Sequence, residues 1–137
     1  MCSSANEHAL TCRIKHVDYR ITDIDRTIEF YQKVFGMKLL RRLDIEELRI
    51  SLLFVGYGDI ETNVVLEFYY SWDAKELEHG NAFQHICIGS NDIHRTFALA
   101  VQCGAVAISK PYKPTYADVE IAWILDPDGY KIELMQD

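Results

Sequence analysis

Two histidines and two glutamates stand at matching points of an internal repeat. The segment HICIGSNDIHRT, which begins at His85, repeats HVDYRITDIDRT, which begins at His16, with identical His, Asp, Ile, Arg and Thr at a constant offset of 69 (85 minus 16). Repetition at this period indicates two copies of one structural unit. Each copy also ends in a predicted strand with a glutamate, Glu67 in the first and Glu133 in the second.

These four side chains form a set that suits a divalent metal ion. Two neutral imidazoles and two carboxylates supply nitrogen and oxygen ligands that nickel, cobalt, zinc and manganese accept, and the carboxylates balance the charge of the ion. A metal that prefers six ligands keeps two positions for water or substrate, as catalytic sites do. A lone strand histidine or glutamate is more often structural, so the prediction depends on the repetition of the pair.

Arg20 and Cys87 share strand faces with these candidate ligands. Arg20 lies on the face of His16, because side chains two or four residues apart on a strand point the same way. Its guanidinium can hold a substrate carboxylate through two hydrogen bonds or pair with a surface acid. Cys87 lies on the face of His85, but the first copy has Asp18 at that position, so Cys87 is interpreted as a packed thiol. The remaining histidines, His8, His79 and His94, are expected at the surface.

The hydrophobic pattern of the first copy predicts strands around one helix. Apolar residues at the helical period run from Ile24 to Phe35, Gly36 ends the helix, and Thr22 or Asp23 can cap its start. The predicted strands cover residues 13–21, 37–43, 49–55 and 63–70, with an acidic loop at 44–47.

The second copy follows the same order. Its helix carries an apolar stripe made of Ile93, Phe97, Ala100 and Val101 and ends at Gly104. A segment with Pro111 and Pro114 leads to a closing hairpin that turns at Asp126-Pro127-Asp128-Gly129. In its second strand Ile132 and Leu134 face one side, and Lys131, Glu133 and Met135 face the other.

Both copies therefore read β-α-β-β-β, and the predicted fold class is α+β, with two repeated modules forming mixed sheets in one domain. We expect an N-terminal tail at 1–12, the first module at 13–70, a linker at 71–82 and the second module at 83–137. A chain of 137 residues, 49% of them hydrophobic, can fold without disulfides.

Composition narrows the classes of function. The net charge is −7 and no basic cluster exceeds Arg41-Arg42, which argues against nucleic-acid binding. No apolar run approaches the roughly 18 residues of a membrane span, and the first residues lack the basic and apolar segments of a secretory signal, so a cytoplasmic location without membrane association is expected. The cysteines, Cys2, Cys12, Cys87 and Cys103, lack metal-binding spacing and are predicted to be free thiols.

Several segments resemble the glyoxalase I family of the vicinal oxygen chelate superfamily. They are HVDYRITDIDRTIEFYQKVFGMKLLRR, LLFVGYG, VVLEFYYSW and LDPDGYKIELM, together with the second histidine, His85. The resemblance extends over nearly everything from Lys15 to Glu133. Relatives with other chemistry differ in their metal ligands. Extradiol dioxygenases and fosfomycin-type thiol transferases have two His and one Glu, and methylmalonyl-CoA epimerases have Gln at the position of the first glutamate. This chain has His, Glu, His and Glu.

The resemblance implies a metal-dependent lactoylglutathione lyase that converts the hemithioacetal of methylglyoxal and glutathione to S-lactoylglutathione through a metal-held enediolate. It implies His16, Glu67, His85 and Glu133 as ligands of one divalent metal per site, with nickel or cobalt favoured over zinc. Glu133 is the first choice for the base that moves a proton from C1 to C2, and Glu67 the second. In the family the sites form at a homodimer interface, with His16 and Glu67 of one chain facing His85 and Glu133 of the other.

The contacts to the thiol depart from the family pattern. The resemblance implies that Arg20 contacts a carboxylate of glutathione. A common Asn after the first glutamate is replaced by Ser71, and a Lys-Gly-Gly-type loop is replaced by KPTYAD, in which Lys113 can substitute. The reaction can therefore use a different thiol. Two further functions stay open. One is an epimerase or lyase that acts on another thioester, and the other is a metal-free dimer that sequesters a ligand. The presence of all four candidate metal ligands argues against the metal-free dimer.

Overall fold

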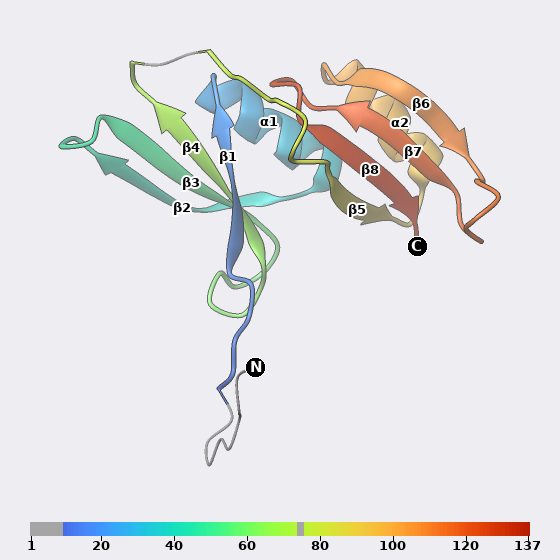
Figure 1. Ribbon diagram of the computed structural model, residues 1–137, viewed down its shortest axis with the longest axis horizontal. Coiled ribbons are helices and arrows are strands. Elements are labelled where there is room, and N and C mark those ends of the chain that lie inside the picture. Colours follow the sequence, from blue (N-terminus) through green and yellow to red (C-terminus); the bar gives the residue numbers. More distant parts are fainter. Residues whose placement is uncertain (1–9, 74–75) are drawn as a thin grey trace.

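The computed structural model describes residues 10–73 and 76–137, which form two similar four-stranded sheets, each with one helix (Figure 1). The first module contains β1 (His16–Ile21), α1 (Ile24–Phe35), β2 (Lys38–Ile45), β3 (Ile50–Gly56) and β4 (Val65–Ser71). The second contains β5 (Ile86–Ser90), α2 (Ile93–Gln102), β6 (Val106–Tyr112), β7 (Ile121–Leu125) and β8 (Lys131–Gln136). The predicted α+β fold of two β-α-β-β-β modules is confirmed.

The two sheets have the same topology, with strand orders β1-β4-β3-β2 and β5-β8-β7-β6. In each sheet the first strand of the module pairs in parallel with the last, and the other neighbours are antiparallel, so both sheets are mixed. The register places Asp18 opposite Glu67 and Cys87 opposite Glu133. The residues that match in the sequence repeat therefore also match in space.

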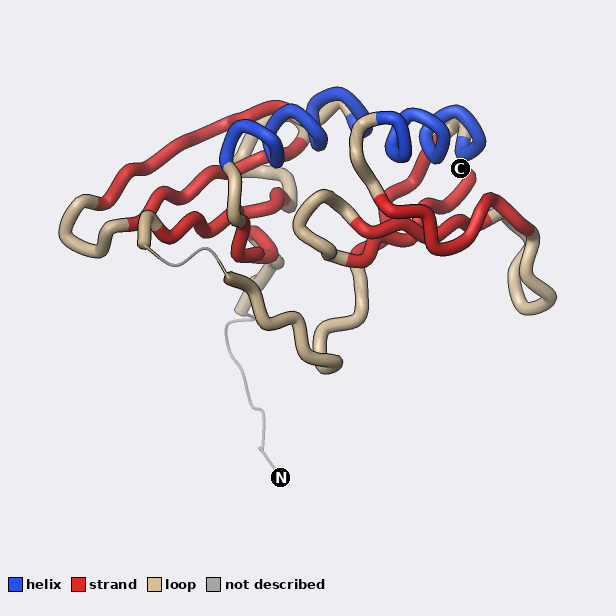
Figure 2. Tube along the Cα trace, turned by 90° about the horizontal axis from the view of Figure 1, so that it is seen from above, coloured by secondary structure: helices blue, strands red, loops and turns tan. Residues whose placement is uncertain are grey.

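Both helices lie on the same side of the sheets (Figure 2). Asp23 caps α1 by accepting a hydrogen bond from the backbone of Arg26, and Gly36 ends the helix in the left-handed conformation at φ 67°. Because the helices cover one face of the sheet, the side chains of β1 alternate between buried and exposed: Tyr19 and Ile21 are buried, whereas the residue between them is exposed. One apolar cluster runs through both modules beneath the helices, and the candidate ligands occupy the opposite faces.

Several strands of the first module differ from the prediction because pairing, rather than hydrophobicity, sets their ends. β1 begins three residues later than predicted, since its neighbour, β4, begins opposite its first residue. β2 extends into the predicted acidic loop, where Asp44 pairs with Ser51 and accepts its hydroxyl hydrogen bond at 2.6 Å. Arg49, predicted to open β3, instead lies in the preceding turn at φ 54°.

The second module also corrects two expectations. The segment with Pro111 is strand β6, which tolerates proline because it lies at the sheet edge next to β7. Val101, predicted on the buried helix stripe, is 41% exposed, while Ile93 and Ala100 are fully buried.

The boundaries of the described part also bear on the prediction. β4 runs to Ser71, the first residue of the predicted linker. Residues 1–9 of the predicted tail, which include Cys2 and His8, and residues 74–75 of the linker lie outside the described residues. Among the described residues, neither helix has the length and apolar character needed to cross a bilayer.

Candidate functional site

The first module brings one predicted histidine and one predicted glutamate together. Nε2 of His16, at the start of β1, lies 2.6 Å from Oε2 of Glu67 on β4. The glutamate side chain is only 10% exposed, whereas the histidine side chain is 41% exposed. A carboxylate that is nearly buried beside an imidazole needs a cation or a proton to offset its lost hydration.

The second module repeats this arrangement. Nε2 of His85 lies 3.0 Å from Oε2 of Glu133 on β8, and their side chains are 28% and 15% exposed. His85 directly precedes β5 rather than lying within it. Its other ring nitrogen, Nδ1, lies 2.9 Å from Oε1 of Gln84.

An aromatic ring packs against each histidine at equivalent positions. Phe54 on β3 contacts His16 edge-on, with ring centroids 5.8 Å apart, and Trp123 on β7 contacts His85 with centroids 4.7 Å apart at 90°. The two aromatic residues are also 69 positions apart in the sequence, and each lies opposite the glutamate of its own module. Each half of the site therefore consists of the same three kinds of side chain at equivalent places in the sheet.

The first half contains an additional carboxyl group, Asp18. Partial burial, with repulsion from Glu67 and a hydrogen bond to it, raises the pKa of Asp18 to about 6. The nearby positive charge of Arg20 opposes this shift. In the second module Cys87 occupies the equivalent position, and burial and the neighbouring Glu133 raise the pKa of its thiol. The raised pKa favours the protonated thiol, but Cys87 is exposed, so the prediction of a packed residue is wrong.

Within one chain the four predicted ligands remain in pairs. In the described ranges, no three side chains of His, Cys, Asp or Glu gather in a cluster that could hold a metal ion. One pair lies on the first sheet and the other on the second.

The predicted substrate contacts occupy different places. Arg20 lines a cavity of about 730 Å³ between the modules, together with Asp18, Gln84 and Lys131. Its guanidinium lies 5.1 Å from the centroid of the Tyr69 ring. Ser71, at the end of β4, lines a smaller recess next to Arg20. Lys113 lies beyond β6 and faces Asp118 at 3.9 Å, away from the residues that line the cavity.

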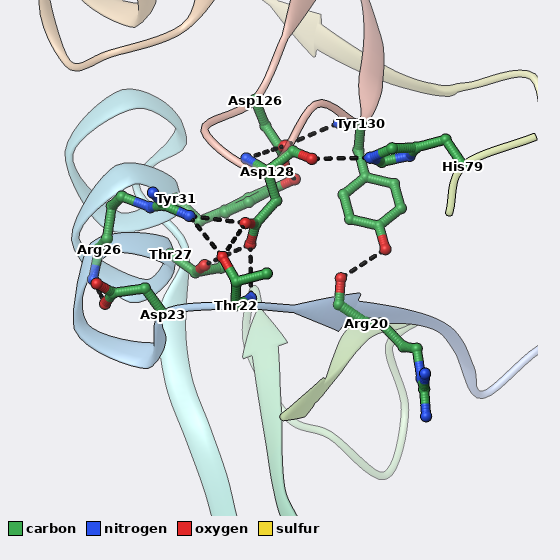
Figure 3. Close-up of polar contacts among 10 residues, drawn as sticks. All are labelled: Arg20, Thr22, Asp23, Arg26, Thr27, Tyr31, His79, Asp126, Asp128 and Tyr130. Carbon is green, nitrogen blue, oxygen red and sulfur yellow. Dashed lines mark hydrogen bonds and ion pairs between the residues drawn. The ribbon is translucent and has the colours of Figure 1, made fainter. Parts of the chain in front are cut away.

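The 126–129 turn fixes the second module onto the first (Figure 3). The carboxylate of Asp128 accepts hydrogen bonds from the backbone NH of Thr22 at 3.1 Å and from its hydroxyl at 2.5 Å, and it forms an ion pair with Arg26 at 2.7 Å. The carboxylate of Asp126 accepts the hydroxyl hydrogen bond of Tyr31 at 2.8 Å. Both carboxylates therefore attach the β7–β8 hairpin to the first module, at α1 and the residues just before it.

Tyr130, directly after the turn, makes a second connection to the first module. Its ring stacks on Tyr19 with centroids 4.8 Å apart, and its hydroxyl donates to the backbone carbonyl of Arg20 at 2.5 Å. His79 of the linker lies with Nε2 2.8 Å from the carbonyl oxygen of Asp128. The two contacts of Tyr130 link β1, which carries His16 and Arg20, to the start of β8, which carries Glu133, and the His79 contact joins the linker to the turn.

Sequence reasoning misses three polar residues of this region. It identifies Asp18 only as the counterpart of a cysteine, and it assigns no role to Gln84 or Lys131. The alternation of β1 places Asp18 on the face of His16, so a signal for it exists in the sequence. No sequence pattern marks Gln84 or Lys131, because their positions depend on how the linker and the second sheet pack.

Known proteins similar to this chain identify its family. Residues 13–134 match the model of the Glyoxalase/Bleomycin resistance protein/Dioxygenase superfamily. The chain belongs to this superfamily. It is 41% identical over 124 residues to a probable lactoylglutathione lyase of Vibrio cholerae, with 90% of each chain covered. It is 40% identical over 125 residues to the lactoylglutathione lyase of Haemophilus influenzae, with 90% of this chain and 92% of the relative covered.

Solved structures of glyoxalase family members have the same fold. Glyoxalase I from Zea mays matches with a TM-score of 0.86 at 34% identity over 91% of this chain. This chain spans only 44% of the maize protein. A Leishmania major glyoxalase I, described as trypanothione-dependent, matches with a TM-score of 0.80 at 34% identity, covering 92% of this chain and 87% of that one. The fold of this family of enzymes is therefore present over nearly the whole chain.

Proposed function

We propose that the protein is a metal-dependent lactoylglutathione lyase that isomerises the hemithioacetal of methylglyoxal and glutathione to S-lactoylglutathione. The observation that carries the proposal is the repeated His–Glu contact, His16 with Glu67 and His85 with Glu133, on equivalent strands of the two modules. The names of the similar bacterial proteins support the same reaction.

The donor set fits a divalent metal ion. In both pairs Nε2 of the histidine and a carboxylate oxygen of the glutamate already converge within 3.0 Å, as they must to ligate one ion, and both glutamates are largely buried. Two imidazoles and two carboxylates suit nickel or cobalt, and also zinc. When bound, the metal supplies Lewis-acid stabilisation of negative charge on the substrate oxygens.

The chain's own residues perform the proton transfer. Glu133 removes the proton from C1 of the hemithioacetal and returns a proton to C2, so that the hemithioacetal becomes a thioester without net oxidation. Glu67 is the second candidate for this base. Both are carboxylates whose side chains are largely buried beside a histidine, where a positioned acid–base group can act on a bound substrate. Arg20 holds a carboxylate of the thiol through its guanidinium, which lies 5.1 Å from the centroid of the Tyr69 ring and lines the cavity between the modules.

The proposal includes a homodimer with two sites. Since each chain offers its ligands in pairs on two separate sheets, a complete four-ligand site requires the first-module pair of one chain to meet the second-module pair of another. A two-fold dimer produces this meeting twice. We extend the proposal to a cytoplasmic location, which the free thiols of Cys12, Cys87 and Cys103 fit.

The thiol and the metal are tested in the same assay. Protein stripped of metal is reloaded separately with nickel, cobalt or zinc, and thioester formation from methylglyoxal is followed in the ultraviolet with either glutathione or trypanothione. We expect activity with glutathione in at least one metal form and none in the stripped protein. Metal-independent activity, or no thioester in any metal form, would refute the proposal. Activity with trypanothione alone would keep the reaction and change the thiol, for which Ser71 and Lys113 are the residues to examine.

A further inference from the structure

We infer that Gln84 is a positioning residue that holds His85 ready for the metal, so that the second module supplies the pre-organised half of the site. The inference rests on the proposed function, because it takes His85 as a metal ligand. It concerns a contact that has no counterpart in the described residues of the first module.

The contact joins the side-chain amide of Gln84 to the ring of its neighbour His85. Oε1 of Gln84 lies 2.9 Å from Nδ1 of His85. An amide oxygen only accepts hydrogen bonds, so Nδ1 carries the proton in this arrangement. With Nδ1 donating to Gln84, Nε2 is the nitrogen left to bind a metal, and it is the one that faces Glu133 at 3.0 Å. Metal-ligating histidines are usually fixed in this way by an acceptor on the second nitrogen.

The ring of Trp123 restrains the same imidazole in a second direction. The two rings meet at 90° with centroids 4.7 Å apart. The hydrogen bond from Nδ1 sets the rotation of the imidazole, and the perpendicular indole limits its tilt. Together with Glu133, three neighbours surround the ring of His85, and 28% of its side chain remains exposed.

The first module provides an internal comparison at the equivalent positions. Lys15 precedes His16 where Gln84 precedes His85, at the same offset of 69. An ammonium group has no acceptor to offer Nδ1. The aromatic neighbour, Phe54, is also farther away, at 5.8 Å, and the His16 side chain is 41% exposed. The imidazole of the first half is therefore less constrained than that of the second half.

Metal affinity should reflect this difference. An acceptor that fixes the tautomer and ring orientation of a histidine ligand removes conformations that cannot bind, and its loss typically weakens metal binding about 10–100-fold. Because the bond of Gln84 is exposed to solvent, we expect the lower end of this range.

The test compares Gln84→Leu with Gln84→Glu and with a matched control, Gln102→Leu. Gln102 ends α2 and is exposed, so its substitution makes the same chemical change on the helix side of the molecule. The dissociation constant for zinc is measured by chelator competition in each full-length protein. We expect about 10-fold weaker binding for Gln84→Leu, no weakening for Gln84→Glu, which keeps an acceptor, and no change for Gln102→Leu.

A second measurement separates positioning from a loss of fold. In the zinc-loaded protein, the proton on Nδ1 of His85 should give a protected low-field NMR signal that disappears or exchanges faster in Gln84→Leu, while the thermal unfolding midpoint stays that of the parent. Unchanged zinc affinity and an unchanged signal in Gln84→Leu would overturn the inference. Failure of the unsubstituted protein to bind zinc, nickel or cobalt would instead refute the proposed function, so the two failures are distinguishable.

Discussion

Replacing Asp128 with alanine should destabilise the protein strongly, although this residue lies in a turn. Its side chain is only 4% exposed, and it connects the β7–β8 hairpin to the start of α1, more than 100 residues earlier in the chain. Alanine removes the acceptor of the Thr22 backbone NH, the acceptor of the Thr22 hydroxyl and the ion-pair partner of Arg26. All three donors, and the Thr27 hydroxyl at a longer 3.5 Å, lie in the first module, so the substitution weakens the attachment between modules.

The magnitude follows from these three contacts. Hydrogen bonds to a charged group contribute about 1.5–3 kcal/mol each, but bonds to one carboxylate are not additive. Arg26 is 45% exposed and regains water when its partner is lost, so its share is small. The backbone NH of Thr22 is less able to regain a hydrogen bond to water. We therefore expect a loss of about 3 kcal/mol for Asp128→Ala, the lower limit for breaking a buried pair, and about 1 kcal/mol for Asp128→Asn, which keeps one oxygen.

Urea unfolding measures the loss, and thermal unfolding should show a decrease of about 10 °C in the midpoint for Asp128→Ala in a chain of this size. Asp118→Ala is the control, because the Asp118 side chain is fully exposed and lies 3.9 Å from the cation it faces, Lys113. It should change the free energy of unfolding by less than about 0.5 kcal/mol. If Asp128→Ala were as stable as this control, the attachment between the modules would not depend on the Asp128 carboxylate.

Three further outcomes are expected. Tyr19→Phe should leave the free energy of unfolding unchanged or raise it by up to ~1 kcal/mol, because the buried Tyr19 hydroxyl lacks a hydrogen-bond partner within the described ranges. Tyr31→Phe should instead lower it by ~1–2 kcal/mol, because the hydroxyl bond to Asp126 is lost, and urea unfolding curves measure both changes. Burial raises the pKa of Asp126 above its usual 3.8, so the folded state keeps a proton that the unfolded state loses. The free energy of unfolding should therefore fall as pH rises above that value. Unfolding curves from about pH 4 to 7 should show a smaller fall for Asp126→Asn than for the parent protein. Glu133→Gln should lower turnover at least ~10²-fold in steady-state assays, and turnover like that of the parent with metal still bound would exclude Glu133 as the base.

The paired ligands could be predicted because they repeat. A single His16 or Glu67 carries little information, but an identical pair at the same point of a second copy requires an explanation, and the register confirms that the copies superimpose in topology. The helices were also predictable, since Asp23 and Gly36 supply the cap and the stop in the sequence itself.

The contacts between the modules could not be predicted. The segment Asp126-Pro127-Asp128-Gly129 is readable as a turn from local chemistry, but nothing local shows that its two carboxylates bind Thr22 and Tyr31. The exposure of Val101 has a similar origin, because the helical period locates an apolar stripe but not the edge of the sheet that covers it.

The parallel pairing of β1 with β4 also has a consequence for how the chain folds during synthesis. β1 lies at the edge of its sheet, and β4 is its one neighbour among the described strands. His16 pairs with Val65, which follows it 49 residues later (65 minus 16). At a translation rate of roughly 5–20 residues per second, β1 waits about 2–10 s for its partner, and β5 repeats this wait for β8. Such non-local pairing raises the contact order, so folding of each module is expected to be slow and to be completed only after its final strand has left the ribosome.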